Sequence, residues 1–268
     1  MKNVWIGIRV LFTCLSLLLG CMFYSAHKNS LKTHRMKVKN SSKADSQLTV
    51  FFISDVHRRR IPTKLLDKVR LRSSSVDLVI IGGDVAENGV PSERVKSNVE
   101  KLSTLGPVYY VWGNNDREIG ESVIREIIKG VGGTILDNES VRISEHPDWI
   151  LSGADDPSSG NTNLQKAVSY TEEYTYHLIA VHNPSLFKKL LQISNPELLL
   201  GGHTHGGQIR FGPFGMQPRG EFKDEKEHAQ LISNGFGTTL VPLRFGAPPE
   251  THLIKIEYKK RSETSRHA

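Results

Sequence analysis

Five short apolar runs in this 268-residue chain end in the same way, because Asp, Asn or His follows each of them, in most cases beside glycine. The runs and their polar ends are 48–54 with Asp55 and His57, 78–82 with Asp84, 108–112 with Asn114, 178–181 with His182, and 198–200 with His203 and His205. Short runs of aliphatic, β-branched and aromatic residues predict buried strands. Ligand crevices form at the carboxyl ends of strands in α/β sheets, so we expect these side chains to share one site.

Helix-like segments accompany the first three runs, and strand-like segments dominate the later part of the chain. The expected helices cover 62–72, 91–104 and 118–129, and the later expected strands cover 149–153, 175–181, 197–201, 229–233 and 251–258. Pro91 at the start of a helix and the Gly106-Pro107 pair after its end are usual boundary residues. This order predicts an α/β (α+β) fold with mixed or paired sheets.

The net charge of +7 is confined to the first 47 residues. That segment holds eight basic residues and one acidic residue, so the totals of 35 and 28 leave 27 of each for residues 48–268. A neutral body without a stripe of basic and aromatic residues argues against nucleic acid as a partner. Cys14 and Cys21 both lie in the first apolar run, which excludes a disulfide, a cysteine zinc site and a thiol nucleophile from the body.

The side chains at the strand ends are typical ligands of a pair of divalent metal ions. Carboxylate oxygen together with imidazole nitrogen suits Zn, Fe or Mn, and a two-metal centre needs about seven protein ligands, one of them a bridging carboxylate. Asp-x-His and His-x-His place two side chains on the same side of an extended backbone. Seven residues fit this chemistry: Asp55, His57, Asp84, Asn114, His182, His203 and His205.

In this order the motifs resemble those of the calcineurin-like metallophosphoesterase superfamily. Its series D-x-H, G-D, G-N-H-D/E, H and G-H-x-H matches Asp55/His57, Gly83-Asp84, 113–116, His182 and 202–205, within a resemblance that covers residues 48–258. The motif G-H-T-H-G-G-Q at 202–208 and the stretches 234–238, 244–245 and 248–250 are most similar to the bacterial membrane-associated branch. The implied fold is a β-sandwich flanked by helices, with a two-metal site at one edge.

The resemblance also implies roles for the seven ligands. It assigns Asp55, His57 and His205 to one metal, Asn114, His182 and His203 to the other, and Asp84 to the bridge between them. A bridging hydroxide would attack phosphorus in line, without a covalent enzyme intermediate. The implied activity is hydrolysis of phosphoester or pyrophosphate bonds in a phosphorylated small molecule, of nucleotide type or lipid-linked. The expected cofactors are two divalent ions, Mn, Fe or Zn.

One position departs from the family pattern. Asn115 stands where the G-N-H-D motif has histidine, and we count it with Asp84 and Asp116 as candidate catalytic residues. Asparagine can hydrogen-bond a phosphoryl oxygen but cannot donate a proton as an acid, which favours substrates with good leaving groups. The departure also leaves open a second interpretation, a catalytically weakened binding or scaffolding module at the membrane.

Three further residues are candidates for binding substrate. Arg58 and Arg117 follow ligand motifs directly and could clamp a phosphate, with a solvated basic loop as the alternative, and Asn114 could also contact substrate. The stretch 206–222 is rich in glycine and proline, a composition that allows a mobile lid. We expect its Phe211 and Phe214 to touch lipid or an acyl-bearing substrate.

Residues 10–26 form an uncharged apolar run whose length lies between a signal-peptide core and a membrane span. We favour a retained membrane anchor. The alternatives are an internal core helix, a cleaved export signal, and a lipoprotein with Cys21 as its lipidated terminus, since 17–21 resembles a lipobox. The expected organisation continues with a flexible basic linker at 27–47, a phosphoesterase domain at 48–260 and a polar tail at 261–268.

Two sequence features give opposite predictions for the side of the membrane on which the body lies. Six basic residues after the apolar run place the body in the cytoplasm by the positive-inside rule, whereas the basic start before a short apolar core argues for export. We favour the extracytoplasmic side. The expected protein is a membrane-attached monomer.

Overall fold

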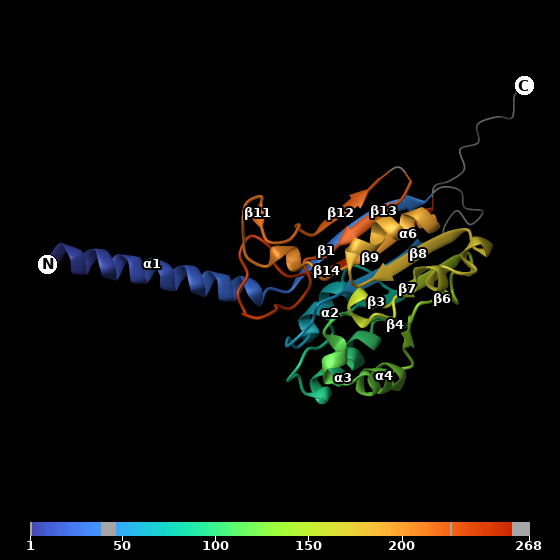
Figure 1. Ribbon diagram of the computed structural model, residues 1–268, viewed down its shortest axis with the longest axis horizontal. Coiled ribbons are helices and arrows are strands. Elements are labelled where there is room, and N and C mark those ends of the chain that lie inside the picture. Colours follow the sequence, from blue (N-terminus) through green and yellow to red (C-terminus); the bar gives the residue numbers. More distant parts are fainter. Residues whose placement is uncertain (1, 39–46, 226, 259–268) are drawn as a thin grey trace, which may run out of the picture.

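The computed structural model describes residues 2–38, 47–225 and 227–258, which form two packed six-stranded sheets and a projecting helix (Figure 1). The first sheet has the order β1 (Ser30–Val38), β14 (Glu250–Tyr258), β2 (Gln47–Ile53), β3 (Leu78–Gly82), β4 (Val108–Val111) and β5 (Thr134–Ile135). The second has the order β12 (Glu221–Asp224), β13 (Ala229–Ile232), β9 (Leu198–Gly201), β8 (Tyr176–Val181), β7 (Trp149–Ala154) and β6 (Glu139–Arg142).

Most neighbouring strands run parallel. In the first sheet only β14 and β2 pair antiparallel, and in the second sheet the outer pairs β12–β13 and β6–β7 do so. The central strands β2, β3 and β4 therefore end at the same edge of their sheet, and β8 and β9 end together in theirs. This arrangement brings the polar residues after these strands to one edge of the molecule.

Helices cover the outer faces of both sheets, as expected for the sandwich predicted above. Helices α2 (Thr63–Arg70), α3 (Ser92–Ser103) and α4 (Glu121–Gly130) bury their apolar faces on the first sheet. Helices α5 (Leu164–Ala167) and α6 (Phe187–Ile193) pack on the second. Between the sheets, side chains such as Phe52 and Ile80 meet Leu178 and Leu200. The sandwich flanked by helices is confirmed.

The expected elements agree with the structure within a few residues, but several short ones were not anticipated. The unpredicted strands include β5, β6, β12 and the hairpin of β10 (Arg210–Phe211) and β11 (Phe214–Gly215). Single turns of 3-10 helix occur at Asp116–Ile119, Pro157–Ser159, Thr171–Glu173, Pro184–Leu186 and His205–Gly207. The expected tail at 261–268 lies outside the described residues.

The expectation of a flexible linker over 27–47 is wrong for residues 30–38, which form β1. This strand pairs in parallel with β14 along its whole length. Leu31 is buried on one face of the sheet, and Met36 and Val38 are buried on the other, between the two sheets. Exposed basic side chains between these positions hide the strand pattern and are typical of a protected sheet edge.

Helix α1 (Lys2–Ala26) projects from the body as a single helix (Figure 1). It is the one helix among the described residues that is long and apolar enough to cross a membrane, by length and composition alone. Only Met22 and Ala26 are buried in it, so the core-helix interpretation is wrong. Cys14 and Cys21 are both exposed on this helix.

A candidate two-metal centre where the sheets meet

All seven predicted ligands converge at the edge where the central strands of both sheets end. Asp55 and His57 follow β2, Asp84 follows β3 and Asn114 follows β4 in the first sheet, whereas His182 follows β8 and His203 and His205 follow β9 in the second. Five of the seven side chains are buried, and Asn114 and His203 are partly exposed. The centre is therefore open to solvent on the side of these two residues.

Five of the ligands have an unusual backbone conformation. The φ angles of Asp55, His57, Asp84, His203 and His205 lie between 50° and 67°, in the left-handed region that non-glycine residues rarely adopt. Such conformations cost about 1–3 kcal/mol each and persist where the surrounding structure holds them, commonly at functional sites. The backbone N–H groups of Asp55 and His57 donate to the carbonyls of Gly83 (2.9 Å) and Asp84 (3.1 Å), which ties the two loops together.

Two glycines are required by the close approach of these loops. A Cβ at Gly113 would collide with the Asp84 carboxylate, and a Cβ at Gly202 would collide with the carboxylate of Asp55. The glycines of the G-N and G-H motifs thus make room for the ligands of neighbouring strands. A side chain at either position would displace a ligand.

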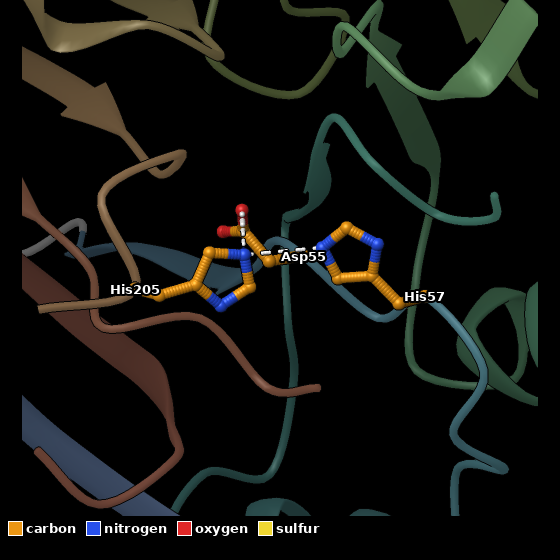
Figure 2. A group of neighbouring side chains, drawn as sticks. All are labelled: Asp55, His57 and His205. Atoms are coloured by element: carbon orange, nitrogen blue, oxygen red, sulfur yellow. Dashed lines mark hydrogen bonds and ion pairs between the residues drawn. The ribbon is translucent and has the colours of Figure 1, made fainter. Parts of the chain in front are cut away.

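Asp55, His57 and His205 form the first group of donors (Figure 2). The Nε2 atoms of His57 and His205 are 3.1 Å apart, and Nε2 of His205 lies 3.3 Å from Oδ1 of Asp55. Their ligand atoms all lie within 4.8 Å of one another, which is compatible with one bound ion.

Asn114, His182 and His203 form the second group. The Oδ1 atom of Asn114 lies 3.1 Å from Nε2 of His182 and 2.9 Å from Nδ1 of His203, and these two nitrogens are 3.2 Å apart. Asn114 thus points into the centre together with two histidines. This is the position of a metal ligand.

Asp84 lies between the two groups. Its Oδ2 atom is 3.8 Å from Nε2 of His57 in the first group and 3.4 Å from Nε2 of His182 in the second. A carboxylate in this position can bridge two ions. Ligand atoms of Asp55, Asp84 and His182 also lie within 4.8 Å of one another, so Asp84 is within reach of both groups.

A hydrogen bond to His182 and an ion-pair contact to His57 lie on the outer side of the two histidines. Nδ1 of His182 lies 2.9 Å from the carbonyl of Gly82, and Nδ1 of His57 lies 2.9 Å from Oε2 of Glu87. A proton on Nδ1 in each case leaves the Nε2 lone pair directed into the centre, as in most protein metal sites. The donor set of nitrogen and oxygen without sulfur therefore fits two divalent ions such as Mn, Fe or Zn.

The charges in the centre are strongly coupled. Burial lowers the pKa of His182, but the Asp84 carboxylate outweighs burial and raises that pKa to about 10. Burial opposes ionisation of Asp84, yet His182 and His57 hold its pKa well below the usual range. Burial lowers the pKa of His205 to about 4. Asp84 therefore carries its negative charge at neutral pH, in a place where cations are stabilised.

Asn115 and Asp116 have different places around Asp84. The backbone N–H and the side-chain amide of Asn115 donate to the two carboxylate oxygens of Asp84, at 2.8 and 2.7 Å. Asp116 is fully buried and accepts from the backbone N–H groups of Asp84, Ala86 and Gly113. Burial, followed by the Asp84 charge, raises the pKa of Asp116 to about 6. Asp116 thus shapes the ligand loops, whereas Asn115 lies at the partly exposed face.

The two candidate phosphate clamps are both engaged by carboxylates. Arg117 donates to both carboxylate oxygens of Asp155, at 3.0 and 2.8 Å, and stacks on Trp112. Arg58 pairs with Glu87, the same carboxylate that contacts His57, but its side chain is 69 % exposed. Arg58 is thus open to a ligand beside the centre, and Arg117 must release Asp155 before it can clamp one.

Three residues around the site were not anticipated from the sequence. Glu87 orients His57, and Asp155 at the end of β7 holds Arg117. Arg244 is fully buried and donates to the carbonyls of His205, Asn234 and others, which fixes the turn that carries His205. Two of the three carried a signal in the sequence: Asp155 follows a predicted strand as the ligands do, and Arg244 lies in the stretch 244–245 that resembles the family.

Comparisons with known proteins identify the family to which the sequence is similar. Residues 48–207 match the calcineurin-like phosphoesterase family model. Uncharacterized protein YpbG of Bacillus subtilis strain 168 is 43 % identical over 237 residues, 88 % of this chain and 90 % of that protein. Phosphodiesterase YaeI of Escherichia coli K12 is 27 % identical over 226 residues, 77 % and 81 % of the two chains. The crystal structure of TT1561 of Thermus thermophilus aligns with a TM-score of 0.49 and 12 % identity, over 71 % of this chain and 90 % of that chain.

Proposed function

Because the chain belongs to the calcineurin-like phosphoesterase family, we propose that this phosphoester hydrolase cleaves phosphodiester or pyrophosphate bonds of a substrate presented at a membrane. The observation that carries the proposal is the convergence of seven nitrogen and oxygen donors at the meeting edge of two sheets. Membership of the family establishes that the chain is a phosphoester hydrolase. The choice of bond and the membrane are our proposal.

The protein's own contribution is to hold and orient the reacting groups. Two bound divalent ions would supply a nucleophilic water and neutralise charge on the phosphoryl oxygens. Asp84 stays ionised between the two donor groups, and His57 and His182 are held with Nε2 directed inward. The partly exposed side of Asn114, Asn115 and His203 is where a phosphoryl group can enter.

The preference for a good leaving group follows from Asn115. Its amide donates to Asp84 and can equally donate to a phosphoryl oxygen, but it has no proton to give to a departing alkoxide. Without a general acid at this position, substrates with weakly basic leaving groups react best. Pyrophosphates and diesters of acidic alcohols meet this requirement.

The membrane part of the proposal rests on α1. Apart from Lys2, Asn3 and Arg9, its 25 residues are mostly apolar, they are exposed over nearly the whole length of the helix, and basic residues follow directly. An enzyme held in this way meets lipid-linked substrates, including nucleotide-type head groups, at high local concentration. We therefore propose a membrane-attached enzyme that binds two divalent ions and acts on a phosphorylated, lipid-linked molecule.

The test is metal-dependent turnover by the full chain in detergent. With Mn²⁺ we expect hydrolysis of bis-p-nitrophenyl phosphate, and Asp84→Asn should lower the rate by about two orders of magnitude, because metal assistance is worth several kcal/mol. Asp67→Asn, which changes an exposed carboxylate on α2, is the matched control and should retain full activity.

Two outcomes distinguish the possible functions. Turnover that needs Mn²⁺ and disappears only in Asp84→Asn supports the enzyme. Metal binding without turnover above the Asp84→Asn variant contradicts it and favours a binding or scaffolding module, the second interpretation suggested by Asn115.

A further inference from the structure

Two loops beside the metal centre expose large apolar side chains. Loop 206–217 contains the hairpin of β10 and β11, and loop 237–246 follows β13. Their exposed residues are Phe211, Phe214 and Met216 in the first loop and Leu240 and Val241 in the second, with Met216 93 % and Leu240 98 % exposed. We call these five residues the apolar loop surface. A cluster of this kind on a polar body typically marks an interaction site.

Contacts between the loops make them one surface. The side-chain amide of Gln208 donates to the carbonyls of Thr239 (2.9 Å) and Val241 (3.0 Å). The rings of Phe211 and Phe245 lie 5.0 Å apart, and the backbone of Ile209 pairs with Phe245. The exposed apolar residues therefore lie on two loops that hydrogen bonds and a ring contact hold together.

The same loops are attached to the end of α1, as Figure 1 shows for β11 and the neighbouring loop. The backbone N–H of Arg244 donates to the carbonyl of Met22 at 3.1 Å. On the other side of the helix end, Arg59 donates to the carbonyls of His27 and Lys28, both at 3.2 Å. These contacts fix the position of the apolar loop surface along the helix axis.

The attachment point determines the depth of the loops in a bilayer. The uncharged run 10–26 has 17 residues and spans about 26 Å, less than the roughly 30 Å hydrocarbon core of a membrane. The whole run is therefore needed to cross the core. Met22 lies four residues before the end of α1, about 6 Å along its axis, so the loop bonded to it lies within about 6 Å of the boundary of the hydrocarbon.

A basic cavity of about 580 Å³ adjoins this surface. Its lining includes Arg58, Arg60 and Arg94 together with Leu240 and Val241. The Nε atom of Arg94 is buried without a hydrogen-bond partner, and Arg60 is exposed. Cationic groups next to apolar ones, at the level where a membrane-spanning helix ends, match the phosphate layer of an anionic membrane.

We propose that the apolar loop surface inserts into the bilayer that holds α1, and that the arginine cavity binds the phosphate of an anionic lipid. The inference rests on the proposed membrane attachment. Loop 206–217 follows the ligand His205 directly, and Glu87, which contacts His57, also lines the cavity. A phosphoester carried by a lipid therefore reaches the metal centre from the membrane surface.

The test measures the environment of single labels on the full chain in lipid nanodiscs. In a background with Cys14→Ser and Cys21→Ser, cysteine is introduced at Met216, Leu240 or the control position Tyr170 and carries an environment-sensitive nitrobenzoxadiazole label. Tyr170 is 80 % exposed and lines a depression beside β6, at the opposite end of the molecule from α1.

In discs of equal parts phosphatidylglycerol and phosphatidylcholine, we expect the labels at Met216 and Leu240 to shift to the blue and to be quenched by a lipid-borne quencher. The label at Tyr170 should do neither. Labels at Met216 and Leu240 that behave like the one at Tyr170 would overturn the proposal. The readout needs no turnover, and recovery of the chain in the discs separately reports insertion of α1, so a failed enzyme is distinguishable from a failed docking surface.

Binding of anionic lipid by the basic cavity, the arginine cavity of the proposal, is tested by changing the lipid and the arginines. Replacing phosphatidylglycerol by phosphatidylcholine should weaken quenching of the Leu240 label, and the variant with Arg60→Gln and Arg94→Gln should lose this difference. The variant with Lys64→Gln and Lys96→Gln, which removes the same charge from exposed positions on α2 and α3, should keep it. Equal lipid dependence in both variants would show that the cavity does not bind anionic lipid.

Discussion

Asn115 is the residue that most distinguishes the chemistry of this centre from the family pattern. It donates to the Asp84 carboxylate through both its backbone N–H and its side-chain amide, at the partly exposed face of the candidate centre. Held in this way, it can stabilise charge by hydrogen bonding but cannot titrate. The proposed preference for substrates with weakly basic leaving groups therefore depends on the identity of this one side chain.

We predict that Asn115→His widens the substrate range. Restoring a group that can act as a general acid should raise kcat/KM for diesters with basic leaving groups by about tenfold to hundredfold and leave bis-p-nitrophenyl phosphate nearly unchanged. The measurement is the dependence of kcat/KM on leaving-group pKa across a series of aryl phosphodiesters. Asn115→Gln keeps the amide and should keep the steep dependence. An equal gain across the series would contradict the acid role.

At the scale of elements, β1 shows how a basic segment becomes part of a fold. It combines buried apolar side chains at Leu31, Met36 and Val38 with exposed basic ones, and β14 supplies the whole row of backbone partners. Charged side chains on a sheet edge discourage pairing with other chains. The lysines that interrupt the apolar pattern of this strand therefore also protect its edge. The strand joins α1 to the sandwich without a free linker over residues 30–38.

We expect Met36→Ala to destabilise the body by about 2–5 kcal/mol, because Met36 is buried between the two sheets and its loss leaves a cavity. Lys37→Ala, one residue away and exposed, should change the free energy of unfolding by no more than about 0.5 kcal/mol. Urea denaturation of the full chain in detergent provides both values. Equal free energies of unfolding for the two variants would contradict a structural role for β1 and would favour a flexible linker at these residues.

At the scale of the whole molecule, the candidate centre links the two sheets of the sandwich. Asp55, Asp84 and Asn114 come from the first sheet, and His182 and His203 come from the second. Ions bound between them would join both halves of the fold and bind the unfolded chain far less well. Metal binding is therefore also a contribution to the stability of the entire body.

We predict that Mn²⁺ raises the melting temperature of the full chain and that a chelator reverses the change. At a hundred times the dissociation constant, binding adds about 2.7 kcal/mol, which corresponds to roughly 5–10 °C for a chain of this size. Differential scanning calorimetry in detergent measures the shift. Asp84→Asn should lose most of it and Asp67→Asn none, and a shift that persists in Asp84→Asn would place the bound metal elsewhere.

The sequence alone was sufficient for the central strands and for the convergence of the candidate ligands at their ends. Both signals are local: an apolar run predicts a buried strand, and the residue after it lies at the strand's carboxyl end. The surroundings of the ligands are not local. Glu87 meets His57, and Arg244 meets His205, across loops that the chain brings together only after folding.

The same distinction applies to the N-terminal fifth of the chain. Its excess positive charge and its apolar helix were evident from the sequence, and on them rests our proposal that this segment attaches the chain to a membrane. Only the tertiary structure showed that β1 completes a sheet and that Met22 is bonded to a loop near the metal centre. Strand pairing and loop docking depend on partners more than 200 residues away, and no local pattern specifies such a partner.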